Sequence, residues 1–214
     1  MNNVYENNMR FLPLLKFIEK YRITIILIVI TIILAITFSI FSNQIAKQNN
    51  LKAASIYSSF LEEISSSDPD NSELNGILDN LLMNYKNTGY TQIALLNKAS
   101  LDARNNNFDE SLKNFEILVD LTDGFNGNKI YNKIARVSAA RILLSNDKYD
   151  EALNMIEKFS SNSTNGYIHE LSGDILFKQN KIDLAISQYE LASSKYNDET
   201  SKSIISMKIS NIGT

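Results

Sequence analysis

The strongest constraint on this chain is an apolar run over residues 23–41, which contains no charged residue, proline or glycine. At about 1.5 Å of rise per residue, a helix of that length extends roughly 28 Å, close to the ~30 Å hydrocarbon thickness of a bilayer. The threonines and the serine in the run can bond back to a carbonyl one turn earlier. A buried core helix is the alternative, but such a helix normally keeps a polar stripe. The run therefore predicts a transmembrane helix over residues 23–42.

Basic residues are unevenly distributed around this run. The N-terminal side carries Arg10, Lys16, Lys20 and Arg22, whereas the matching window after the run carries Lys47 and Lys52. The positive-inside bias predicts that residues 1–22 are cytoplasmic and that the remainder is exported. A cleaved signal peptide is the alternative. The run exceeds the usual ~7–15 apolar residues of such a peptide and no small-x-small cleavage site follows it, which favours an uncleaved signal anchor with one crossing.

Composition narrows the class of protein. The formal net charge is −3 and the basic residues are scattered among acids, so no basic face indicates nucleic-acid binding. Cysteine is absent, which excludes disulfides, thiolate catalysis and cysteine-ligated metals. His169 is the only histidine, so a zinc site would need carboxylates alone. With no nucleophile–base pair or phosphate-binding loop visible, the sequence predicts a chain that is not an enzyme and uses no cofactor, metal or small-molecule substrate.

Helical spacing of apolar residues continues beyond the run. It predicts a helical stalk over residues 43–69, stopped by the Ser/Asp/Pro-rich segment 65–70. Asp70, with Glu73 three residues later, resembles a capping box that opens the next helix. We therefore expect four segments: a cytoplasmic tail (1–22), a transmembrane helix (23–42), the stalk (43–69) and a helical periplasmic domain (70–214).

Three turns in this last segment look alike. Residues 106–112, 147–153 and 180–186 each read polar, polar, apolar, Asp, and then a small residue two places later. From residue 90 onward only helical periodicity is visible, which predicts an all-α fold. Asp109, Asp150 and Asp183 are well placed to be N-caps of the helices that follow the turns.

The repeat extends beyond the turns to three kinds of position. A small residue precedes each turn, a second small residue follows it, and a bulky apolar residue stands four places later: Ala99, Ser111 and Phe115; Ala140, Ala152 and Ile156; Gly173, Ala185 and Tyr189. This resembles the tetratricopeptide pattern of paired antiparallel helices. Ala152 and Ala185 are 33 residues apart, near the ~34-residue unit, whereas the 41 residues from Ser111 to Ala152 include an enlarged loop around residues 124–128. Residues 201–212 would form a closing helix that caps this α-solenoid.

A tail, one span, a stalk, tetratricopeptide-like units and a closing helix together resemble the family of ancillary subunits of the SecYEG translocon. The likeness is carried by Tyr5-Glu6 with Lys16, by residues 85–90 ahead of Ala94, by residues 173–176 and by residues 207–212. Residues 7–10 depart from the acidic tail that is usual in the family.

The resemblance implies a non-catalytic protein of a bacterial inner membrane with a periplasmic domain. It implies association with the SecYEG translocon and with a membrane-anchored periplasmic chaperone, and a role in handing emerging polypeptides to periplasmic chaperones. A membrane-tethered adaptor for envelope or cell-wall assembly is the alternative. A regulator that acts through its cytoplasmic tail is disfavoured, because twenty-two residues make a small signalling surface.

The same repeat register predicts which side chains line the concave face of the solenoid. They are Arg104, Val137, Arg141, Leu144, Tyr167, Asp174, Phe177 and Lys178. Arg104 and Arg141 are expected to hold a partner's carboxylate, and Tyr167 and Phe177 to offer apolar contact. The alternative is a mixed solvated surface. His169 is expected to pack against a neighbouring helix.

Overall fold

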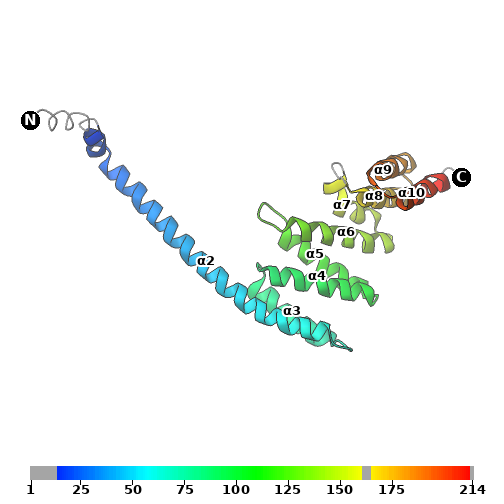
Figure 1. Cartoon of the computed structure of the whole chain (residues 1–214), viewed down its shortest axis with the longest axis horizontal. Coiled ribbons are helices and arrows are strands. Elements are labelled where there is room, and N and C mark those ends of the chain that lie inside the picture. Colours follow the sequence, from blue (N-terminus) through cyan, green and yellow to red (C-terminus); the bar gives the residue numbers. More distant parts are fainter. Residues whose placement is uncertain (1–13, 161–164, 213–214) are drawn as a thin grey trace, which may run out of the picture. The chain divides into compact units, whose positions relative to one another are not determined.

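The computed structural model describes residues 14–160 and 165–212, and every regular element within these ranges is an α-helix (Figure 1). The predicted all-α class is confirmed. The chain separates into two compact units, Met1–Lys52 and Ala53–Thr214, and helix α2 (Arg22–Ile64) runs through the point of division. Each unit is described by itself below.

The first unit contains the apolar run. Within the described residues, α2 is the one helix long and apolar enough to cross a membrane, with a mean hydropathy of 3.0 over its most apolar window and none of that window buried. Thr31 and Thr37 donate their hydroxyl hydrogens to the carbonyls of Leu27 and Ile33, at 2.8 and 3.0 Å, as expected for hydroxyls in such a helix. Residues 1–13 of the expected cytoplasmic tail lie outside the described residues.

The second unit begins with the last turns of α2. Ala53, Tyr57 and Phe60 are buried in its core, so this part of the expected stalk packs against the helices that follow. The helix ends at Ile64, directly before the segment predicted to stop it.

Helix α3 (Asn71–Tyr85) is capped by Asp70, whose carboxylate accepts from the Ser72 amide at 2.7 Å. The predicted capping box is wrong in its second half, because Glu73 is not the residue that bonds the Asp70 amide. Glu63, on the last turn of α2, accepts that amide at 2.6 Å. The turn brings the end of α2 back to the start of α3, and this places Glu63 where Glu73 was expected.

Three helix pairs follow and stack in chain order (Figure 1). They are α4 (Gly89–Arg104) with α5 (Phe108–Thr122), α6 (Lys129–Ser145) with α7 (Tyr149–Ser160), and α8 (Gly166–Lys178) with α9 (Ile182–Lys195). Helix α10 (Glu199–Ile212) packs on α9 and closes the stack. All nine repeat residues predicted to pack inside the pairs are buried. The tetratricopeptide-like solenoid and its closing helix are confirmed.

Small residues let the helices of a pair approach closely. In the first pair, the Ser111 hydroxyl donates to the Ala99 carbonyl at 2.7 Å, so the two small positions touch. In the third pair, a Cβ on Gly173 would lie 2.6 Å from the Tyr189 ring. The aromatic ring therefore occupies the space that the glycine leaves.

Each pair turns through the same backbone motif. Asn106, Asp147 and Asn180 lie in the left-handed region, with φ of 60°, 59° and 61°. In the second pair, the Lys148 amide donates to the Leu143 carbonyl at 2.9 Å and the Asp147 amide donates to the Leu144 carbonyl, and the other two turns repeat this pattern. These two bonds define a Schellman C-cap, and Asn and Asp are the non-glycine residues that adopt its left-handed position most readily.

The predicted N-cap role of three aspartates is wrong. Helices α5, α7 and α9 begin at Phe108, Tyr149 and Ile182, because the Schellman turn brings the chain into helical geometry earlier than expected. Asp109, Asp150 and Asp183 therefore lie within the first turn of each helix. There their negative charge still interacts favourably with the positive end of the helix dipole.

Gly173 gives a test of the close approach. Gly173→Ala should lower the free energy of unfolding by about 1–3 kcal/mol, because the added methyl meets a buried ring that has no room to move. Urea unfolding of the detergent-solubilised chain, followed by circular dichroism, measures the change. The matched control is Gly76→Ala in α3, where nothing lies within 4 Å of the added Cβ. That substitution should stabilise by about 0.5–1 kcal/mol through helix propensity, and a loss of similar size at both glycines would contradict the close contact.

Candidate functional site

A hollow of about 440 Å³ lies between α4, α5 and α6. Two of the predicted groove residues line it: Arg104, the last residue of α4, and Arg141 on α6. Phe108 and Phe115 of α5 contribute aromatic surface, and the other lining side chains are mostly small: Ser100, Ala103, Ser138, Ile142 and Ser145. Small residues on the facing sides of α4 and α6 leave room for the hollow. The Schellman turn that ends α4 sets the position of Arg104 at its rim.

The electrostatics of this hollow favour an anionic group. No acidic residue is among the described residues that line it, and both arginines are exposed. Neither guanidinium makes a hydrogen bond or an ion pair with any residue that the structure describes. By contrast, Arg136, on the same helix as Arg141, pairs with Asp123 at 3.3 Å. Free guanidinium groups bind carboxylates through paired, charge-assisted hydrogen bonds.

Three other predicted groove residues contribute mainly to the core. Val137, Leu144 and Tyr167 are half-buried and pack against the core cluster shared by α6, α7 and α8. Burial raises the pKa of the Tyr167 phenol, and the positive charge of Arg141 partly offsets this rise. Tyr167 therefore extends the surface next to Arg141 while most of its ring supports the core.

Asp174 does not offer a free carboxylate to a partner. Its oxygens accept from the Lys208 ammonium at 2.6 and 2.8 Å and from the Tyr189 hydroxyl at 2.7 Å. Asp174 and Phe177 line a separate hollow of about 210 Å³ against α10, rather than the one that holds the two arginines. Lys178 is exposed at the end of α8. Seven of the eight predicted residues therefore divide between one cationic hollow, a core cluster and a helix junction, and Lys178 belongs to none of these.

The junction with α10 is a network that sequence reasoning missed. Lys208 of α10 also pairs with Glu170 at 2.8 Å, and Glu170 accepts from the Tyr196 hydroxyl at 2.6 Å. One lysine thus bridges two carboxylates of α8, and two tyrosines complete their hydrogen bonding. No sequence motif indicates these contacts, because most of them join residues more than twenty positions apart.

A buried ion pair was missed as well. Lys98 and Asp102 are 2% and 1% exposed, with the ammonium 2.6 and 2.8 Å from the two carboxylate oxygens. The Asn114 amide of α5 donates to the same carboxylate at 3.4 Å. The i, i+4 spacing of Lys98 and Asp102 was a signal for an ion pair but gave no sign of burial. His169 is buried, as expected, with its Nδ1 2.9 Å from the Gln188 side chain of α9.

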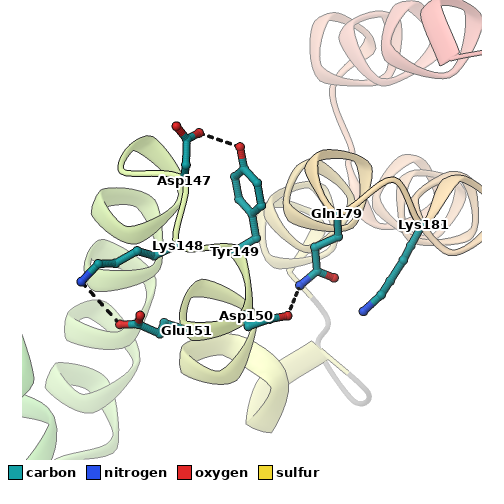
Figure 2. Close-up of a pocket in the computed structure, with 7 residues that line it drawn as sticks. All are labelled: Asp147, Lys148, Tyr149, Asp150, Glu151, Gln179 and Lys181. Carbon is teal, nitrogen blue, oxygen red and sulfur yellow. Dashed lines mark hydrogen bonds and ion pairs between the residues drawn. The ribbon is translucent and has the colours of Figure 1, made fainter.

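A second hollow, of about 380 Å³, lies between the α6–α7 turn and the α8–α9 turn (Figure 2). Its side chains largely satisfy one another. Tyr149 donates to Asp147 at 2.6 Å, Lys148 lies 3.8 Å from Glu151, and the Gln179 amide donates to Asp150 at 2.8 Å. The last bond ties the second repeat to the third, which makes this hollow a junction between repeats. No group of acidic and histidine side chains suited to a metal occurs within the part of the chain that the structure describes.

Comparison with known proteins places the chain in a family. Residues 16–214 match the family described as Tetratricopeptide repeat-like domain, and the chain belongs to this family. The ancillary SecYEG translocon subunit of Buchnera aphidicola subsp. Schizaphis graminum (strain Sg) is 28% identical over 97 residues, which cover 44% of this chain and 50% of the relative. The chain thus spans about half the length of the curated relative that it matches. The resemblance predicted from the sequence is confirmed by this relative.

Two solved structures share the fold. MamA RS-1 ArsTM double mutant aligns with a TM-score of 0.54 and 13% identity, over 76% of this chain and 94% of that one. MamA 41-end from Desulfovibrio magneticus RS-1 aligns with a TM-score of 0.52 and 12% identity, over 77% and 93%. At such low identity these likenesses concern the fold alone.

The α10 network predicts a loss of stability at alkaline pH. Burial and the bonds to Asp174 and Glu170 raise the pKa of the Tyr189 and Tyr196 phenols. Burial alone would lower the pKa of Lys208, but its bonds to the same carboxylates outweigh this and raise it above 10.5. Groups with raised pKa stabilise the fold below their unfolded pKa, here about 10, and this contribution disappears as pH rises through the folded pKa. Urea unfolding at pH 8 and pH 11 should show the loss.

Substitution isolates the network from general alkaline effects. Lys208→Met should lower stability at pH 8 by about 1–3 kcal/mol, because two carboxylates lose their shared cation, and should reduce the further loss at pH 11. Lys202→Met is the matched control on the same helix. Among the described residues, Lys202 has its one ion pair with the 89%-exposed Glu199, so this substitution should cost under about 0.5 kcal/mol. Equal effects of the two substitutions would argue against the network.

Proposed function

We propose that this protein is a scaffold of a bacterial inner membrane that associates with the SecYEG translocon and helps hand emerging polypeptides to periplasmic chaperones. The observation that carries the proposal is the match to a relative named as an ancillary SecYEG translocon subunit, in a chain with a tetratricopeptide-like domain and one candidate span among its described residues. In this proposal residues 1–22 are cytoplasmic, residues 23–42 cross the membrane, and the stalk and domain that follow are periplasmic.

The hollow that holds Arg104 and Arg141 is the proposed contact for a protein partner, such as a membrane-anchored periplasmic chaperone. Two unpaired guanidinium groups in a hollow without acidic lining among the described residues favour a segment that carries carboxylates. Phe108, which is 38% exposed, adds apolar contact at the rim. The proposed role is binding, since the described residues of the hollow include no nucleophile with an adjacent base.

Crosslinking tests the partner and the site together. A photo-crosslinking residue at Ser138, inside the hollow, should capture translocon subunits or a periplasmic chaperone in cells. Arg141→Glu should reduce the captured product about tenfold or more, because a charge-assisted bond of roughly 1.5–3 kcal/mol is replaced by repulsion. Immunoblotting and mass spectrometry of the crosslinked products provide the measurement.

The matched control is Lys195→Glu, the same charge change at an exposed lysine of α9 away from the hollow. It should leave capture intact. Capture that Arg141→Glu does not weaken would remove the hollow from the proposal. Products that contain envelope or cell-wall assembly enzymes in place of translocon subunits would favour a membrane-tethered adaptor for those enzymes.

Membrane topology has its own test. The full-length chain should remain in the membrane after a carbonate wash, because a span of this hydropathy is held by the hydrophobic effect. In spheroplasts, added protease should degrade a C-terminal epitope and spare an N-terminal one. A cytoplasmic marker that stays intact shows that the membrane is sealed. A protected C-terminal epitope would reverse the proposed orientation.

A further inference from the structure

The enlarged loop between α5 and α6 holds apolar side chains in solvent. Phe125 is 98% exposed and Ile130, in the first turn of α6, is 71% exposed. Single exposed apolar residues are ordinary, but a fully exposed aromatic ring with a second exposed apolar side chain five residues later leaves contact surface unused.

The backbone fixes Phe125 in this position. Gly124 adopts φ of 94°, which favours glycine, and the Gly127 amide donates to the Gly124 carbonyl at 3.3 Å. A Cβ on Gly127 would collide with the Thr122 carbonyl, so this position is closed to other residues. Phe125 therefore stands at the tip of a tight turn, held between two glycines that the turn requires.

Cations surround this turn. Phe125 lines a hollow of about 340 Å³ with Lys129, Lys158 and Phe159, and the Lys133 ammonium lies 6.0 Å from the Phe159 ring. Asp123 is the one carboxylate among the described residues that line the hollow. It is already paired with Lys158 at 2.5 Å and with Arg136 at 3.3 Å. We call Phe125, Ile130, Lys129, Lys133 and Lys158 the Phe125 edge.

The Phe125 edge lies at a defined end of the second unit. Successive helices run antiparallel, so turns alternate between the two ends of the stack. The turns around residues 65–70, 105–107, 146–148 and 179–181 therefore lie at one end, where the last two line a common hollow, and the α3–α4 and α5–α6 connections lie at the other. Ala53, where the chain enters this unit, lies toward the second end, because Tyr57, one turn later, packs against Tyr90 at the start of α4. This is also the end of the Phe125 edge.

We propose that the Phe125 edge binds the surface of an anionic bilayer, with Phe125 and Ile130 entering the interface and the lysines contacting lipid phosphates. Exposed apolar tips flanked by lysines suit this boundary, where cations are attracted to anionic lipid. A protein partner would have to supply carboxylates for the lysines and a complementary apolar pocket for the Phe125 ring. An anionic bilayer offers phosphates and an apolar interior to any projecting ring with cations around it. The inference rests on the proposed membrane anchor, which holds the unit close to lipid.

The absence of tryptophan from the chain allows a direct test. Full-length Phe125→Trp is reconstituted into vesicles of phosphatidylglycerol and phosphatidylcholine, with brominated acyl chains in a parallel set. The tryptophan emission should shift to the blue and be quenched at least twofold by the brominated lipid. Lys129→Glu in the same background should reduce this quenching. Leu184→Trp is the matched control, because Leu184 is 56% exposed at the opposite end of the stack and should show neither effect.

Several outcomes would overturn the inference. If the emission of the Phe125→Trp variant stays unshifted and unquenched, the edge does not contact lipid. If quenching is equally strong in phosphatidylcholine alone, the lysines have no role in binding. A blue shift that grows with protein density without bromine quenching would identify a second copy as the occupant. Carbonate extraction of the same vesicles tests the anchor separately. Release by carbonate would overturn the anchor, and bromine quenching in the Phe125→Trp variant would still report lipid contact by the edge itself.

Discussion

The close approach of paired helices at small residues is the constraint on which the rest of the second unit depends. Ala99 with Ser111, Ala140 with Ala152 and Gly173 with Ala185 allow each pair to touch, and a bulky residue one turn later fills the space that the contact leaves. Because each pair buries its bulky residue against the next helix, the pairs must stack in order. The hollow beneath Arg104 and Arg141 and the position of the Phe125 edge both follow from that stacking.

The stack handles its charged residues differently along its length. Lys98 and Asp102 form a dry pair inside the first repeat, where neither charge has access to water. Between the third repeat and the closing helix, the partly exposed Lys208 bridges Glu170 and Asp174 and holds α10 against α8. Arg104 and Arg141 have no such partner within the described residues, although the chain has more acidic than basic residues. The hollow to which we assign binding thus holds two guanidinium groups that the described part of the fold leaves available to a carboxylate from outside.

Much of the fold could be predicted from local pattern, and less of the site. The apolar run, the stop before residue 70 and the nine repeat positions depend on spacing along the chain, which the sequence displays directly. The aspartates after each turn were misplaced because a Schellman turn has no apolar signature and starts the next helix early. Asp174 was assigned to the groove because its partner Lys208 lies thirty-four residues away, beyond any periodicity. Arg104 and Arg141 line the same hollow because the repeat register sets the positions of both, and their assignment to a partner groove stays a prediction.

Within the part of the second unit that the structure describes, the core consists of three clusters rather than one. The first joins the end of α2 to α6, the second joins α6 to α8, and the third joins α8 to α10 through Leu176, Tyr189 and Ile205. Contacts are largely confined to neighbouring helices, so the helices at one end of the stack can open while the other clusters stay packed. Fluctuations that detach α9 and α10 leave the first cluster packed, and with it the arginine-lined hollow between α4, α5 and α6. Amide exchange through such partial openings would accordingly run faster in α9 and α10 than in the helices that line the hollow.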